Sequence, residues 1–172
     1  MYTDSVNPLS LADDALLAQC DLDRFRGSGP GGQKRNKTES AVRLRHRPTG
    51  LCAVASESRS QHENRRRALR RLRQRIAAEL RRPVDLERYE VPAELRGLCP
   101  GITPHLGRRD PAYPLAVQQL LDLFAALQAS VADTARRLGL STAATSRLLL
   151  EDTWVARAAN ALRSARGLRP LR

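Results

Sequence analysis

One short stretch, Gly27-Ser28-Gly29-Pro30-Gly31-Gly32, restricts the fold of this chain more than any other, because five of its six residues are glycine or proline. Glycine loses much conformational entropy when it is ordered in a helix or strand, and proline has no backbone N–H to donate. The sequence therefore predicts an irregular loop here, with regular structure on either side of it.

Regular structure is expected before and after this loop. Residues 9–17 can form a short helix, and residues 20–25 a strand. After the loop, residues 41–47 alternate apolar and basic side chains, a turn follows at Pro48-Thr49-Gly50, and residues 51–56 alternate again. Alternation of this kind on both sides of a turn predicts a β-hairpin with one buried face.

A cationic helix is predicted next. Ser60 is a suitable N-cap, and Glu63 stands three residues further on, as in a capping box. Apolar residues then recur at helical spacing, namely Leu69, Leu72, Ile76 and Leu80. Most other positions are basic: Arg59, Arg65, Arg66, Arg67, Arg70, Arg71, Arg73 and Arg75. Close like charges on a helix repel one another, so these arginines exceed what stability requires and indicate an anionic partner.

The positive charge of the chain is concentrated in its first half. The formal net charge is +12, and residues 24–82 hold 18 Lys/Arg against 4 Asp/Glu, whereas the rest holds 12 against 14. Lys34 and Lys37 are the only lysines, so a compositional bias explains arginine in place of lysine but not the local excess. Such an excess is typical of proteins that bind a phosphate backbone, and we expect RNA.

Membrane attachment is the competing explanation of a basic segment. The chain has no long apolar run, and the basic helix lacks an exposed aromatic stripe, so no membrane partner is expected. The first residues have no basic region followed by a long apolar stretch, and Asp13 and Asp14 disfavour a transit peptide. Cys20, Cys52 and Cys99 are widely spaced and odd in number, which indicates reduced thiols in a cytoplasmic protein.

The second half of the chain predicts a helical unit. Residues 82–113 are rich in proline and glycine and include a short helix near residues 93–98. Helices are expected after them, at Leu115–Gln128, Ser130–Leu138, Ser141–Leu150 and Thr153–Ala165, with Trp154 as an anchor of the last one.

Two of these helices carry a helix-turn-helix pattern. Ala135, Gly139 and Leu148 fall at the usual positions, and Ser141 caps the second helix, although Thr145 replaces the customary Val or Ile. The second helix offers only Arg147 as a cation, and it ends in acidic residues. Docking to the ribosome or to a partner is therefore favoured over sequence-specific DNA binding.

The glycine loop carries the chemistry expected of this chain. Two glycines before Gln33 permit dihedral angles closed to other residues and leave room for a close approach. A backbone N–H held in such a turn can donate to a developing oxyanion or alkoxide, which is worth about 3–4 kcal/mol. Glutamine does not titrate, but its amide can orient a water molecule. A phosphate-binding loop is rejected, because Gln33 stands where that motif requires lysine.

The sequence around this loop resembles a known family. The run from Arg24 to Ala77 is similar to the catalytic domain of class I peptide-chain release factors, and in particular to their short, single-domain members that act on stalled ribosomes. The matching features, in chain order, are Ser28-Gly29-Pro30-Gly31-Gly32-Gln33, Asn36-Lys37-Thr38, Val42-Arg43-Leu44, Pro48-Thr49-Gly50, Glu57-Ser58-Arg59-Ser60-Gln61 and Asn64-Arg65.

The resemblance implies a ribosome-dependent peptidyl-tRNA hydrolase. Its catalytic residues would be Gly31, Gly32 and Gln33, with Gln33 a target for N5-methylation. The loop would enter the peptidyl-transferase centre, where ribosomal RNA and peptidyl-tRNA complete the site. Lys34-Arg35 departs from the His-Val pair of many members, without touching the triplet. We expect RNA contacts from Arg26, Ser28, Lys34, Arg35, Asn36, Lys37, Arg59, Arg65, Arg66 and Arg70.

No metal or cofactor is expected. His46, His62 and Cys52 are interpreted as packing or solvent-facing residues, because no metal-ligand spacing is present.

These observations together predict an α+β fold. A small domain with an antiparallel β-hairpin or sheet packed on the arginine-rich helix is followed by a small all-α, helix-turn-helix-like domain. The expected boundaries are residues 1–19 for an N-terminal segment, 20–82 for the catalytic domain, 83–111 for a connector and 112–172 for the helical domain.

The expected function is codon-independent release of peptides from stalled ribosomes or large subunits by a monomeric, cytoplasmic protein. Release factors that read stop codons use additional domains, for which we expect no room ahead of Arg24. The basic tail is limited to residues 163–172, so stall recognition is expected to involve the helical domain or a recruiting protein. The alternative is a non-catalytic ribosome- or nucleic-acid-binding adaptor or regulator that uses the helix-turn-helix-like domain.

Overall fold

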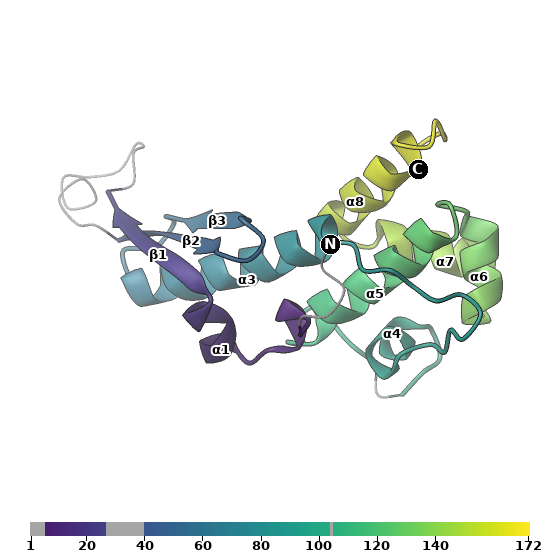
Figure 1. Ribbon diagram of the computed structural model, residues 1–172, viewed down its shortest axis with the longest axis horizontal. Coiled ribbons are helices and arrows are strands. Elements are labelled where there is room, and N and C mark those ends of the chain that lie inside the picture. Colours follow the sequence, from purple (N-terminus) through teal and green to yellow (C-terminus); the bar gives the residue numbers. More distant parts are fainter. Residues whose placement is uncertain (1–5, 27–39, 104) are drawn as a thin grey trace. The chain divides into compact units, whose positions relative to one another are not determined.

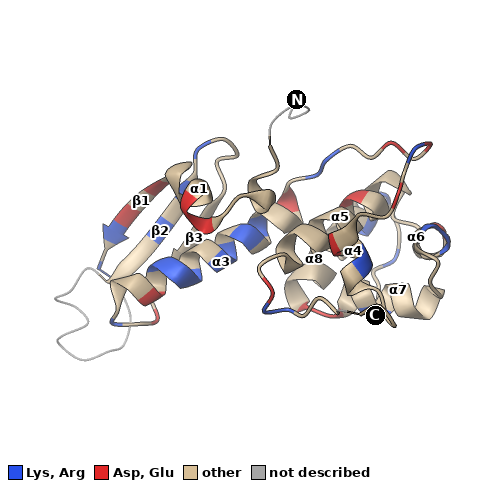
Figure 2. Ribbon diagram, turned by 90° about the horizontal axis from the view of Figure 1, so that it is seen from below, with Lys and Arg blue, Asp and Glu red and all other residues tan. Residues whose placement is uncertain are grey.

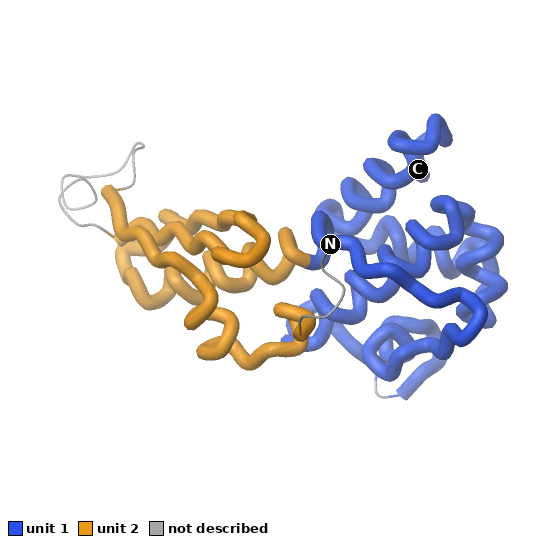
Figure 3. The backbone as a smooth tube through the Cα atoms, viewed as in Figure 1, with its two compact units in different colours: residues 1–5, 77–172 blue, residues 6–76 orange. Residues whose placement is uncertain are grey.

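The computed structural model describes residues 6–26, 40–103 and 105–172 (Figure 1). The chain divides into two compact units, Val6–Ile76 and Ala77–Arg172 (Figure 3). The first unit holds the strands and most of the basic helix, and the second is helical. The predicted coarse class, a mixture of helices with a small antiparallel sheet, is confirmed.

A three-stranded antiparallel sheet forms the centre of the first unit. Its strands are β1 (Cys20–Phe25), β2 (Ala41–His46) and β3 (Cys52–Ala55), in the spatial order β1-β2-β3. The predicted strand and hairpin are therefore confirmed. β2 ends at His46 because its carbonyl oxygen accepts the Gly50 N–H at 2.8 Å and its N–H donates to Leu51 at 2.8 Å, which closes the turn.

The sheet has one buried face, as the alternation of apolar and basic residues predicts. Val42 and Leu44 of β2 are fully buried, whereas Arg43 between them is exposed. Ala53 and Ala55 of β3 are buried on the same pattern. Burial of these side chains removes apolar surface from water and stabilises the hairpin, at roughly 25 cal/mol per Å² of apolar area.

The long helix α3 (Gln61–Glu79) lies along the sheet in Figure 1. Its apolar stripe is buried and comprises Ala68, Leu69, Leu72 and Ile76. The predicted cationic helix is thus confirmed, with a length of 19 residues.

The capping box predicted at the start of α3 is only half formed. The Glu63 N–H donates to the Ser60 hydroxyl at 3.3 Å, as expected. The Glu63 carboxylate does not return to the Ser60 N–H, however, because the Ser58 hydroxyl lies between them. That hydroxyl accepts the Ser60 N–H at 3.1 Å and donates to Glu63 at 2.5 Å. Ser58 therefore relays the second half of the cap.

Two short helical pieces precede the sheet where one helix over residues 9–17 is predicted. They are η1 (Pro8–Ser10) and α1 (Asp13–Ala18). The break between them has a physical cause: the Arg73 guanidinium donates to the Leu9 carbonyl oxygen at 3.2 Å and to the Leu11 carbonyl oxygen at 2.6 Å. Those carbonyl groups are therefore bonded to a side chain of α3.

The second unit consists of five helices within its described residues. They are α4 (Ala93–Leu98), α5 (Tyr113–Ala126), α6 (Val131–Leu138), α7 (Thr142–Leu150) and α8 (Thr153–Ser164). Each helix predicted from the sequence is present, with ends that differ by one or two residues. The core is aliphatic around one phenylalanine and includes Leu95, Leu98, Leu120, Leu121, Phe124, Leu149 and Val155.

The predicted anchor of α8 packs as expected. The Trp154 ring meets the Tyr113 ring edge-on, with centroids 6.3 Å apart. The Tyr113 hydroxyl in turn donates to the Asp152 carboxylate at 2.8 Å, immediately before α8. Trp154 and Tyr113 thus connect the starts of α8 and α5.

A tight turn joins α6 to α7. Ser130 and Ser141 cap the two helices, since their hydroxyls accept the N–H groups of Asp133 and Ala144 at 3.3 and 3.1 Å. Gly139 ends α6 with φ +67°, a backbone conformation that favours glycine. The description of this pair as a helix-turn-helix-like domain stays a prediction.

Across the described ranges, no helix is both long enough and apolar enough to cross a membrane.

Candidate functional site

The residues predicted to carry the chemistry lie outside the described residues. These are Gly31, Gly32 and Gln33, together with the expected RNA contacts Ser28, Lys34, Arg35, Asn36 and Lys37. Their roles stay predictions. The structure does describe the frame that holds both ends of this segment.

Neighbouring strands hold the two ends of the segment. Phe25 at the end of β1 is the direct partner of Ala41 at the start of β2. Two pairs further into the sheet, the Arg43 guanidinium donates to the Asp23 carboxylate of the opposite strand, with Nε and Nη2 at 3.0 and 2.8 Å. Cross-strand pairs of this kind fix the register. Residues 26 and 40 therefore lie at the same end of the sheet.

A buried asparagine ties this end of the sheet to α3. Asn64 is 0% exposed, and its side-chain nitrogen donates to the carbonyl oxygens of Ser40 and Ser58 at 2.7 and 2.8 Å. Its side-chain oxygen accepts the Ser58 N–H at 3.0 Å. One side chain thus joins the residue where the glycine-rich segment rejoins the sheet to the segment before α3.

The segment between β3 and α3 is held by Glu57. Its carboxylate accepts from the Arg71 guanidinium at 2.5 Å and from the Ser56 N–H at 3.1 Å. The hydrogen bond from Arg71 is the main reason why the pKa of Glu57 lies below its ordinary value. Because Glu57 and Ser58 are both held, the position of the next residue, Arg59, is restricted.

Four of the eight arginines singled out in the sequence have structural partners. Arg67 pairs with Glu63 at 2.5 Å, and Arg71 donates to the Val54 carbonyl oxygen as well as to Glu57. Arg75 donates to the Cys52 carbonyl oxygen at 2.6 Å. Arg73 is 8% exposed and binds Asp13 at 2.8 Å besides the carbonyl groups of Leu9 and Leu11. The expectation that all eight arginines exceed what stability requires is therefore wrong for these four.

The other four arginines are those for which we expect RNA contacts. Arg59, Arg65, Arg66 and Arg70 are exposed, and none makes a hydrogen bond or ion pair with another described residue. Arg66 is near enough to Glu63 to help lower the pKa of that carboxyl group, after the larger effects of Ser58 and Arg67. Figure 2 shows the basic residues distributed along α3. Arg26, at the end of β1, is exposed and has a partner within the structure.

Three of the four unpaired arginines directly follow the residues that hold the base of the glycine-rich segment. Arg65 and Arg66 directly follow Asn64, which bonds to Ser40 at 2.7 Å. Arg59 directly follows Ser58, whose carbonyl oxygen Asn64 also binds at 2.8 Å. A cationic surface and both ends of the predicted catalytic loop thus belong to one end of this unit.

His46 is a buried packing residue, as expected. Its ring nitrogens lie 2.8 Å from the Thr49 hydroxyl and 3.0 Å from the Gln19 amide oxygen. Burial and the nearby Arg47 charge lower the pKa of His46, so the ring is neutral at pH 7. His62 is exposed. Within residues 6–26, 40–103 and 105–172, no three His, Cys, Asp or Glu side chains come together as metal ligands would.

Sequence reasoning missed what Asn64 and Arg73 do. Asn64 was noted only as a match to the family, yet it precedes Ala68 and Leu72 by four and eight residues and so falls on the apolar stripe of α3. A polar residue on such a stripe has to be hydrogen-bonded, which was the available signal. Arg73 also falls beside that stripe, next to Leu72 and three residues before Ile76.

Comparison with known proteins defines the class to which this unit belongs. Residues 16–94 match the RF-1 domain, so the resemblance of this part of the chain to the catalytic domain of class I peptide-chain release factors is confirmed. The match begins within α1, contains the whole sheet and α3, and ends at the start of α4.

Individual relatives are similar over the same part of the chain. Peptide chain release factor 1 of Brachyspira hyodysenteriae is 46% identical over 76 residues, which are 43% of this chain and 21% of that protein. The proteins of the same name from Rickettsia bellii and Acidiphilium cryptum are 48% identical over 77 residues and 52% identical over 70 residues. These matches cover 44% and 40% of this chain, and 22% and 20% of those proteins. The chain therefore spans about a fifth of the length of these relatives.

Proposed function

We propose that this chain promotes hydrolysis of the ester that joins a nascent peptide to transfer RNA in the ribosomal peptidyl-transferase centre, without reading a codon. The observation that carries the proposal is the RF-1 domain match over residues 16–94, which contains Gly31-Gly32-Gln33 and the frame that holds this segment. The similar proteins are named peptide chain release factor 1, and release is the activity that this name describes.

In the proposed mechanism, the backbone N–H of Gln33 donates to the oxyanion or to the leaving 3′ oxygen of the transfer RNA. One preorganised donor of this kind stabilises a transition state by about 3–4 kcal/mol. The Gln33 amide orients the attacking water and leaves no space for larger nucleophiles. Ribosomal RNA and the transfer-RNA end supply the remaining groups, because the triplet contains no base.

The proposed role of the unpaired arginines is to bind ribosomal RNA. Arg59, Arg65, Arg66 and Arg70 are exposed, and they make no hydrogen bond or ion pair with the described part of the chain. Arginine fits phosphate bidentately, and each phosphate contact releases counterions. Binding at this end of the unit would bring the base of the glycine-rich segment close to RNA.

A release assay on stalled ribosomes tests the catalytic proposal. Gln33→Ala or Gly32→Ala should abolish release and leave ribosome association nearly unchanged. Gln74→Ala, on α3, and Gly107→Ala are matched controls; a Cβ added at Gly107 would meet no atom within 4 Å. Both controls should release peptide at the wild-type rate. Release that is unchanged in both loop variants would contradict the mechanism.

A salt titration tests the RNA contacts. Replacing Arg65 and Arg66 together by Glu should weaken ribosome binding and flatten its dependence on salt, because fewer counterions are released. The control replaces Arg88 and Arg157, two exposed arginines of the helical unit, by Glu and changes the net charge equally. An unaltered salt slope in the first variant, or an equal change in the control, would count against an RNA contact at α3.

Codon independence is tested on the same ribosomes. Release should proceed equally with a stop codon, a sense codon or no codon in the decoding site. A requirement for a stop codon would show that the chain acts as a termination factor and not in ribosome rescue.

The alternative is a non-catalytic adaptor that uses the helical unit. It draws support from the capped turn between α6 and α7, in which Gly139 has φ +67° and Ser141 caps the second helix at 3.1 Å. Wild-type protein that binds ribosomes without releasing peptide would favour this alternative.

The remaining features of the proposal concern the state of the protein. We propose a cytoplasmic monomer that is brought to its target by the helical domain or by a recruiting protein, with Gln33 N5-methylated. Sedimentation measures the oligomeric state, peptide mass spectrometry detects the methyl group, and co-sedimentation with separated particles distinguishes whole ribosomes from large subunits.

A further inference from the structure

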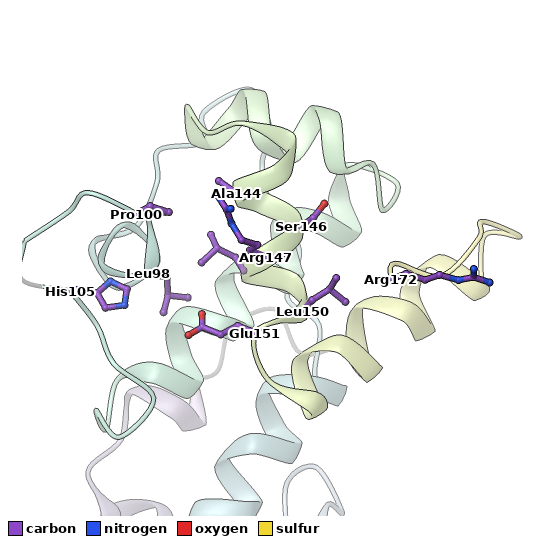
Figure 4. A pocket seen from close by; sticks show the side chains of 10 residues that line it. Leu98, Pro100, His105, Ala144, Ser146, Arg147, Leu150, Glu151 and Arg172 are labelled. Atoms are coloured by element: carbon purple, nitrogen blue, oxygen red, sulfur yellow. The ribbon is translucent and has the colours of Figure 1, made fainter.

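The helical unit has a hollow on α7 that the proposed function does not use. Its volume is about 590 Å³, within the range of roughly 300–1,000 Å³ that is usual for ligand sites. Figure 4 shows α7 between two walls, with Leu98, Pro100 and His105 on one side and Arg172 on the other. The hollow therefore runs across α7 like a groove.

The surface of the groove is mainly apolar. Leu148 of α7 and Leu98 of α4 are 9% and 3% exposed and close its base. Leu150 is partly exposed, and Pro100 is exposed at one edge. Leu150 offers apolar surface to water that a bound apolar side chain would cover.

The polar residues of the groove include a cation without a partner among the described residues. Arg147 is exposed, lines the groove and makes no hydrogen bond or ion pair with the described residues. The carboxylate in the lining, Glu151, is bound by Arg108, whose Nε lies 3.3 Å from its side-chain oxygen. Arg108 also pairs with Asp152 at 3.2 Å. Arg147 and Arg172 are thus available to an anion.

We infer that this groove binds a short segment of a partner protein in which an apolar side chain stands next to an aspartate or glutamate. The apolar side chain packs on Leu150, and the carboxylate pairs with Arg147, three residues earlier on α7. Apolar surface with a few placed cations is complementary to such a segment.

Nucleic acid fits this groove less well. Binding of single strands relies on aromatic platforms and a continuous row of cations. The described lining has the His105 imidazole as its one aromatic ring, and Arg147 and Arg172 do not form a row. The inference does not depend on catalysis by the first unit, so it can fail or hold separately from the proposed function.

Selection of peptides tests the inference. The full chain is used to select from a random dodecapeptide library displayed on phage, with removal of phage that also bind the Leu150→Asp variant. The recovered peptides are synthesised with a fluorophore, and their affinities are measured by fluorescence anisotropy. They should share an apolar residue beside Asp or Glu. Leu150→Asp should weaken binding by about tenfold or more, as expected of a central apolar contact.

Arg147→Gln supplies the specific readout. It should weaken binding by roughly tenfold, the effect of one charge-assisted hydrogen bond. Replacing the peptide carboxylate by its amide should have the same effect on wild-type protein and no further effect on Arg147→Gln. Arg157→Gln removes an exposed arginine of α8 outside the groove and should change nothing. Circular dichroism establishes that each variant is folded, and Leu150→Gln provides a milder second variant.

Three results would overturn the inference. These are failure to recover peptides that discriminate against Leu150→Asp, recovered peptides without acidic residues, and equal affinities of wild-type and Arg147→Gln protein. A short labelled RNA or DNA duplex is measured in parallel. If the probe binds wild-type protein but not Arg147→Gln, and the peptide does not compete with it, the groove is a nucleic-acid surface instead.

Discussion

Replacing Asn64 by alanine should destabilise the first unit and expose a specific backbone amide. The side chain is 0% exposed and makes three hydrogen bonds. Two of them satisfy the carbonyl oxygens of Ser40 and Ser58, and the third accepts the Ser58 N–H. Alanine removes all three and leaves buried backbone groups without partners.

The size of the effect follows from the number of groups that lose a partner. A neutral hydrogen bond contributes about 1 kcal/mol, and a buried group left unsatisfied costs about 1–3 kcal/mol. Some of these groups can reach water after small movements, so we expect a loss of about 3 kcal/mol in the free energy of unfolding. That value corresponds to roughly a hundredfold change in the unfolding equilibrium constant.

Hydrogen exchange measures this effect at the site itself. The Ser58 N–H donates to the Asn64 side-chain oxygen at 3.0 Å, so its exchange should accelerate roughly a hundredfold in Asn64→Ala. The control is Asn160→Ala in the helical unit, which removes a similar pair of bonds, to the Leu171 carbonyl oxygen and N–H at 3.4 and 2.7 Å. It should leave the exchange of Ser58 unchanged.

A functional consequence accompanies the structural one. Ser40 is the residue at which the glycine-rich segment rejoins the sheet, so Asn64→Ala should also slow peptide release under conditions where the protein is folded. Unchanged protection of the Ser58 amide, or a loss of stability below about 0.5 kcal/mol, would refute the reasoning, because an exposed substitution has an effect of that size.

Three further outcomes are expected. Burial lowers the pKa of His46 from 6.5, so the folded state disfavours the protonated ring, and stability should fall as the pH drops below 6.5. Thermal unfolding of His46→Gln should not show this loss of stability at low pH. Arg73→Met should lower the free energy of unfolding, measured in urea, by about 2–4 kcal/mol, because the carbonyl groups of Leu9 and Leu11 lose their donor. A loss below about 1 kcal/mol would mean that water replaces the guanidinium group. Ser141→Ala should lower the stability of the helical unit by about 1 kcal/mol, because α7 loses its N-cap. Hydrogen exchange in α7 measures this loss, and unchanged exchange rates would contradict the role of the cap.

The elements that could be predicted from the sequence are those specified by neighbouring residues. Alternation in residues 41–47 and 51–56 identified the hairpin, and the spacing of Leu69, Leu72 and Ile76 identified α3. The serine caps and Gly139 located the ends of α6 and α7 within one residue. Periodicity and capping are local properties, which a single sequence contains.

The sorting of the arginines could not be predicted in the same way. Arg73 meets Asp13 across 60 residues, and Arg71 meets Glu57 across 14. Which arginine has a partner therefore depends on the packing of α3 with residues far away in the chain. The relay through Ser58 is local, but it brings a third residue into a cap that usually involves two, so the spacing of Ser60 and Glu63 alone did not predict it.

Two arginines of α3 that bind the edge of β3 affect how copies of this protein behave at high concentration. Among the described strands, β3 has a neighbour on one side only, and its Cys52 and Val54 carbonyl groups point away from that neighbour. Arg75 and Arg71 each donate to one of these carbonyl groups at 2.6 Å. An incoming chain would have to displace both guanidinium groups before it could extend the sheet. The β3 edge of the sheet is thus protected against edge-to-edge aggregation by residues that simple inspection would assign to RNA binding.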